Sequence, residues 1–150
     1  MRKTIVVGVG NPILGDDGVG IHVVRMLRRR VKNRGVFFEE ALTGGMNLVD
    51  LILGYDKAVV VDAVAGEEKG LVKRFSLSDF ETVHSLNPHG MSFLEAIDLA
   101  KKMGENRLPS EIVVVGVTIS ESSSFKEELS REVADAVPRA VEMVLSELRK

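Results

Sequence analysis

The sequence predicts an α/β fold: a single three-layer domain over residues 1–150, with a twisted, mostly parallel sheet of five strands flanked by helices on both faces. Two observations favour this class. Short β-branched runs that are apolar on both faces alternate with amphipathic helical stretches, and this alternation is typical of parallel sheets covered by helices. The chain also has 150 residues, a length typical of one domain and short for two.

The first part of the chain contains three predicted strands and two predicted helices. Residues 4–9 (TIVVGV) and 58–64 (AVVVDAV) are apolar on both faces, so we expect each to be a strand buried on both sides. A glycine-rich turn follows the first strand, and a helical pattern with a basic last turn covers residues 18–30. Residues 36–41 are predicted to form another strand, and residues 47–53 a short helix.

The second part of the chain contains two predicted strands and two predicted helices. Residues 71–75 (LVKRF) alternate between apolar and basic side chains, which indicates an edge strand with one exposed face. A helix is expected at residues 91–103 and a buried strand at residues 111–118. Ser124 and Glu127 have the spacing of a capping box, so we expect a long amphipathic helix from there to the C-terminus.

The composition excludes several classes of function. The chain has no cysteine, so thiolate nucleophiles, zinc fingers and cysteine-ligated clusters are excluded. Twenty basic and 22 acidic side chains give a net charge of −2, which lacks the basic surface that nucleic-acid binding requires. No apolar run is long enough to cross a membrane, and no signal peptide is apparent at the start. We therefore expect a cytoplasmic protein without nucleic-acid or membrane partners.

The glycine-rich turn after the first strand does not fit a dinucleotide site. Gly8 and Gly10 match the opening of that fingerprint, but its third glycine falls at Ile13. Asp16 and Asp17 also place two negative charges where a pyrophosphate would bind the start of the helix, and like charges repel there. This turn therefore indicates chemistry based on carboxylates.

Three side chains suited to metal ligation or acid–base chemistry are predicted near the carboxyl ends of strands. Asp17 follows the first strand, Asp62 ends the third, and His89 lies in the loop before the third helix. If the first and third strands are neighbours, Asp17 and Asp62 share one edge of the sheet, and His89 could close its third side. Two carboxylates and an imidazole suit nickel, zinc, manganese or iron.

Each candidate also has an ordinary structural interpretation. Asp17 could be an acid in the first turn of a helix, although Asp16 fits that role better, and His89 could be a simple loop residue. Asp62 has the weakest structural explanation, because a carboxylate that ends an apolar run is costly to bury unpaired. Paired aspartates can also activate water directly, which metal binding does not exclude. The basic run at residues 28–32 is either a solvated helix end or a docking patch for an acidic partner.

Five segments spread over nearly the whole chain resemble the hydrogenase maturation endopeptidases. The longest is GVGNPILGDDGVG at residues 8–20, which resembles the N-terminal signature of that family. The other four are TGGM at residues 43–46, VDA at 61–63, NPH at 87–89 and VGV at 115–117, in the order that the family has them.

The resemblance implies an endopeptidase that removes a C-terminal extension from the precursor of the large subunit of a nickel–iron hydrogenase, after nickel insertion. The family's catalytic and nickel-recognising residues fall on Asp17, Asp62 and His89. On this interpretation the substrate carries the nickel, and cadmium or zinc could replace it at the same ligands in crystals. The nickel would position the scissile carbonyl or polarise it; alternatively, an aspartate activates water directly.

The loop after the second strand is expected to bind substrate. Thr43, Gly44 and Gly45 would line the substrate cleft with backbone groups, and a simple tight turn is the alternative. Two rival functions also stay open: a non-catalytic module of the same fold that binds a metal or a partner chain, and a metal-dependent hydrolase that acts on a small molecule. The sequence indicates no oligomeric state.

Overall fold

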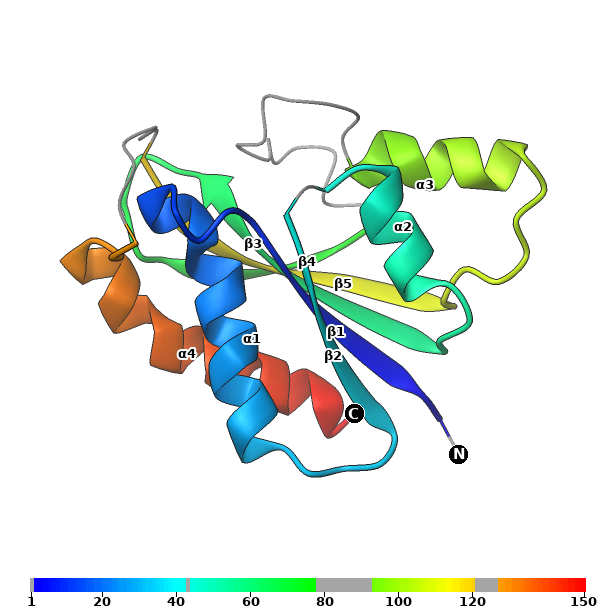
Figure 1. Cartoon of the computed structure of the whole chain (residues 1–150), viewed down its shortest axis with the longest axis horizontal. Helices are drawn as coiled ribbons and strands as arrows, with labels where there is room; N and C mark the ends of the chain where they lie inside the picture. Colours follow the sequence, from blue (N-terminus) through cyan, green and yellow to red (C-terminus); the bar gives the residue numbers. More distant parts are fainter. Residues whose placement is uncertain (1, 43, 78–92, 121–126) are drawn as a thin grey trace.

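The computed structural model describes residues 2–42, 44–77, 93–120 and 127–150. These residues form a sheet of five strands in the order β2-β1-β3-β5-β4 (Figure 1). Every neighbouring pair is parallel except β4 and β5, which are antiparallel. The strands are β1 (Thr4–Val9), β2 (Val36–Ala41), β3 (Lys57–Ala65), β4 (Val72–Ser76) and β5 (Glu111–Ile119).

Helices cover both faces of the sheet, as Figure 1 shows, and this confirms the predicted three-layer α/β fold. Two pack together on one face and enclose one apolar core with it, and the other two enclose a second core on the opposite face. The first pair is α1 (Val19–Arg30) and α4 (Arg131–Leu148), and the second is α2 (Met46–Ile52) and α3 (Phe93–Lys102).

The burial of the strands follows their sequence patterns. The apolar strand β3 is buried from its first residue to Val64, because it lies in the middle of the sheet with a core on each side. The alternating strand β4 lies at the edge and exposes Lys73 and Arg74, which confirms the prediction of an edge strand. Within the described ranges, no helix combines the length and the apolar character needed to cross a bilayer.

A buried ion-pair cluster fixes the end of α4 to the sheet. The Lys57 Nζ atom at the start of β3 donates to the Glu147 Oε2 atom and to the Glu147 carbonyl, both at 2.9 Å. Lys57 and Glu147 are 1% and 2% exposed, so both charges lie inside the protein. Arg74 and Lys150 also donate to the Glu147 carboxylate, and Glu111 pairs with Lys57. The cluster therefore joins β3, β4, β5 and α4.

The C-terminal helix begins later than the sequence predicted. Residues 121–126, which include Ser124, lie outside the described residues, and the helix begins at Arg131 rather than near Glu127. Ser130 is the N-cap residue, but its side chain makes no capping hydrogen bond. The Ser130 hydroxyl donates instead to Asp16, which belongs to a short 3-10 helix, η1 (Gly15–Gly18), just before α1.

Candidate active site

The structure confirms that β1 and β3 are neighbours, so their carboxyl ends lie at one edge of the sheet. The last paired residues are Gly8 and Val61, and beyond them β1 leads toward α1 on one face of the sheet. The chain enters β3 from α2 on the other face. Connections that pass to opposite faces separate at the strand ends, and such a point is where open α/β sheets bind ligands.

Close backbone contacts hold the glycine-rich segment against this edge. Gly10 has a φ of +138°, and a Cβ placed on it would lie 2.0 Å from the Asp17 carbonyl oxygen. A Cβ on Gly20 would lie 2.2 Å from the carbonyl oxygen of Val61, the residue before Asp62. Only glycine allows main chains to approach so closely. The segment that carries Asp17 is therefore fixed on the strand that carries Asp62.

Asp17 is a half-buried acid in η1. Its Oδ2 atom accepts a hydrogen bond of 2.9 Å from the backbone N–H of Asn11. Burial raises the pKa of Asp17 above its usual value of 3.8, and the hydrogen bond from Asn11 opposes burial with a smaller effect. A carboxylate with a raised pKa is suited to accept a proton or to ligate a cation.

Asp62 lies on β3, one residue beyond the last pair with β1. The residue is 8% exposed, and its Oδ1 atom accepts a hydrogen bond of 2.8 Å from the Ala63 backbone N–H. Val61 and Ala63 belong to the core beneath α1 and α4. Because side chains alternate along a strand, the carboxylate of Asp62 projects toward the opposite face, which α2 and α3 cover.

Asp16 has a structural role that differs from the predicted one. It is 6% exposed, and its Oδ1 and Oδ2 atoms accept hydrogen bonds from the Ser130 backbone N–H and hydroxyl, at 2.7 and 2.8 Å. Gly18, not Asp16, is the N-cap of α1, so the expected cap of that helix is wrong. Because Ser130 engages both oxygens, Asp16 is poorly placed to activate water. Sequence reasoning missed Ser130, since 114 positions separate it from Asp16 and no local pattern links them.

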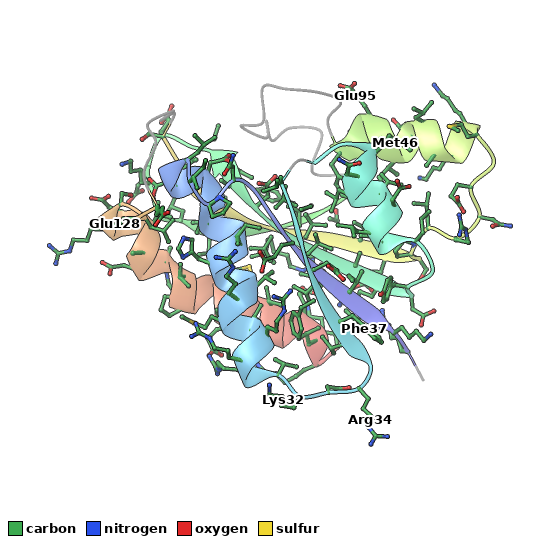
Figure 2. The ribbon with its side chains drawn as sticks, in the orientation of Figure 1. Lys32, Arg34, Phe37, Met46, Glu95 and Glu128 are labelled. Carbon is green, nitrogen blue, oxygen red and sulfur yellow. The ribbon has the colours of Figure 1, made fainter. Side chains whose placement is uncertain are left out.

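The remaining predicted site residues lie partly outside the described residues. This applies to His89 and Thr43, so their roles stay predictions. Gly45 is the N-cap of α2, and a Cβ on Gly44 would lie 4.0 Å from a methyl group of Val9, so this loop lies beside the end of β1. Figure 2 shows Met46 and Glu95 at the adjacent starts of α2 and α3. In the part of the chain that the structure describes, no three or more His, Asp or Glu side chains are grouped to hold a metal ion.

Comparison with known proteins identifies the family. The family model of hydrogenase maturation proteases (HycI) matches residues 21–147. This chain belongs to the hydrogenase maturation protease family. Membership implies a hydrolase of the endopeptidase type, and it confirms the resemblance of the five sequence segments.

Relatives and solved structures agree with this assignment. The chain is 38% identical over 140 residues to protein FrxA of Pyrococcus furiosus, covering 91% of this chain and 98% of that protein. It is 27% identical over 153 residues to the hydrogenase 2 maturation protease of Escherichia coli, covering 99% of this chain and 92% of that protein. The solved structure of the hydrogenase maturating endopeptidase HybD from E. coli superposes with a TM-score of 0.81 at 26% identity, covering 99% of this chain and 93% of that one.

Proposed function

We propose that this maturation protease removes the C-terminal extension from the precursor of a nickel–iron hydrogenase large subunit, in the cytoplasm, after the nickel has been inserted. The observation that carries the proposal is the position of two acids at the separation point of β1 and β3, in a chain of this family. A polypeptide substrate requires an open edge of this kind, where loops from several strands can contact an extended segment.

Asp17, Asp62 and His89 are proposed to recognise the nickel that the substrate carries. The chain has no cysteine, so it can meet a metal only through oxygen and nitrogen ligands. Such a set can contact a nickel centre while thiolates of the substrate retain it. Nickel bound in the substrate supplies positioning or polarisation of the scissile carbonyl. Gly44, Gly45 and Thr43 are proposed to align the extension through backbone groups.

An alternative mechanism uses an aspartate as the direct activator of water. Asp17 and Asp62 are the candidates, because Ser130 already engages both oxygens of Asp16. The raised pKa of Asp17 favours its use as a proton acceptor, since a base with a higher pKa binds the abstracted proton more strongly. The two mechanisms differ in whether cleavage requires nickel in the precursor.

The test uses purified precursor in nickel-loaded and nickel-free forms, with loss of the extension followed by intact mass. Wild type is expected to cut only the nickel-loaded form. Asp17→Asn, Asp62→Asn and His89→Ala are expected to slow cleavage at least about a hundredfold. The matched control is Asp98→Asn, which makes the same chemical change at an exposed acid on α3 and is expected to cut at the wild-type rate.

The outcomes separate the proposals. Unimpaired cleavage by both Asp62→Asn and His89→Ala would refute nickel recognition by these residues. Cleavage of the nickel-free precursor at the wild-type rate would favour direct activation of water. A precursor that binds but is never cut would support the rival function of a non-catalytic binding module.

A further inference from the structure

A crease of about 310 Å³ lies on the surface between α1 and α4. It is on the face of the sheet opposite to the one toward which Asp62 projects, so it is separate from the candidate active site. Its α1 side is formed by His22, Arg25, Met26 and Arg29, and its α4 side by apolar residues that include Leu129 and Val137.

The α1 side of the crease offers polar groups without partners. His22 is half-buried, and its Nε2 atom is buried without a hydrogen-bond partner among the described residues. Such an atom in a native protein calls for a ligand or a water, because an unsatisfied buried polar atom is costly. Burial lowers the pKa of His22, and the charge of Arg25 lowers it further, so the imidazole is neutral near pH 7 and can donate one N–H.

Arg29 is the second polar group at the crease. The other arginines of α1 form ion pairs: Arg25 and Arg28 with Glu40, and Arg30 with Glu142. Arg29 has no ion-pair partner in the described part of the chain. The helix α1 contains no acidic residue that could neutralise it. An unpaired guanidinium beside a buried imidazole N–H favours a carboxylate, which can accept hydrogen bonds from both.

The apolar side of the crease completes the recognition surface. Leu129, Val137 and Pro138 present only carbon atoms, and Met26 adds a flexible thioether. Ala134 lies between them with a short side chain, which leaves the crease open. A volume of about 310 Å³ is at the lower end of ligand sites and suits one or two side chains rather than a large cofactor.

We infer that this crease docks an acidic segment of the precursor protein, with one carboxylate at Arg29 and His22 and a neighbouring apolar side chain against α4. The inference rests on the proposed function, because it takes the precursor as the partner. The charge of the crease selects an acidic occupant, and its open, mixed polar and apolar lining matches a polypeptide. Docking away from the acids would hold the folded part of the precursor while its extension reaches the active site.

The test compares two crease variants with a matched control. Arg29→Glu reverses the charge, and Ala134→Trp fills the crease from an exposed position on α4. Arg34→Glu is the control, because it makes the same charge change beyond the C-terminal end of α1, where Figure 2 shows Arg34 pointing away from the ribbon. Thermal unfolding of all three verifies that they remain folded.

Calorimetry with nickel-free precursor measures binding, and intact mass with nickel-loaded precursor measures KM and kcat. We expect both crease variants to weaken binding and raise KM at least about tenfold, with kcat within about twofold of wild type. The control is expected to match wild type. Equal binding by wild type and crease variants, or equal weakening by the control, would overturn the inference.

The two proposals can fail separately in this experiment. If wild type cuts the precursor and the crease variants cut it equally well, the docking site is refuted and the proposed function stands. If wild type binds the precursor through Arg29 but never cuts it, the docking site stands and the proposed function is refuted. If wild type neither binds nor cuts any precursor, both are refuted.

Discussion

The buried cluster around Glu147 allows a quantitative prediction about stability. Burial alone would raise the pKa of Glu147, but hydrogen bonds from Arg74, Lys57 and Lys150 outweigh burial and lower the pKa from 4.5 to about 2. A pKa lowered to that extent corresponds to about 3 kcal/mol of stabilisation of the charged form. Removing the charge from Glu147 would also leave the Lys57 ammonium buried with a weaker set of partners.

We expect Glu147→Gln to lower the free energy of unfolding by about 3–5 kcal/mol at pH 7, the usual cost of removing one partner from a buried ion pair. The folded-state pKa lies below the unfolded one. The stabilisation is therefore fully present above about pH 4.5 and is lost as the pH falls toward 2. The difference between wild type and variant should shrink over that range.

Urea unfolding followed by circular dichroism, repeated from pH 7 to pH 3, measures this difference. The control is Glu142→Gln, which lies on the same helix in an exposed ion pair with Arg30 and should cost less than about 1 kcal/mol. A cost for Glu147→Gln below about 1 kcal/mol at pH 7, or a cost independent of pH, would refute the reasoning.

Three further predictions concern the candidate active site. Ser130→Ala removes one hydrogen bond to the buried Asp16 carboxylate and should lower the free energy of unfolding by about 1.5–3 kcal/mol, measured by urea titration. Gly20→Ala places a Cβ against a backbone oxygen of β3 and should reduce the thermal midpoint far more than Gly54→Ala, whose Cβ would meet nothing within 4 Å; equal midpoints would contradict the close approach. Asp17→Asn should stabilise the fold at pH 7 while abolishing cleavage. The raised pKa of this acid means that its charge costs stability above the raised pKa, and the gain should disappear as the pH falls below 3.8.

The sheet could be predicted from the sequence because its signals are local. An apolar β-branched run such as residues 58–64 identifies a buried strand without reference to any other segment, and β3 contains that run. The shared edge of Asp17 and Asp62 also followed from the usual order of strands, which places β1 beside β3.

The features that the sequence did not reveal depend on contacts between distant segments. The pair Lys57 and Glu147 is separated by 90 positions, and the pair Asp16 and Ser130 by 114. Neither leaves a periodic pattern in the chain. The start of α4 was misplaced for a related reason: the capping-box spacing is a local signal, but the structure begins the helix at Arg131, beside the residue that Asp16 binds.

The glycine contacts of the η1 segment have a consequence for how this protein can vary. Asp17 owes its place to main-chain atoms that touch at Gly10 and Gly20, and neighbouring side chains contribute little to it. Side chains in the same segment, such as the exposed Ile13, can therefore change without moving the acid. Substitution of either glycine moves the backbone itself. Mutational tolerance along this segment should thus alternate sharply between interchangeable positions and positions that accept glycine alone, so a deep mutational scan would outline the acid's support without reference to activity.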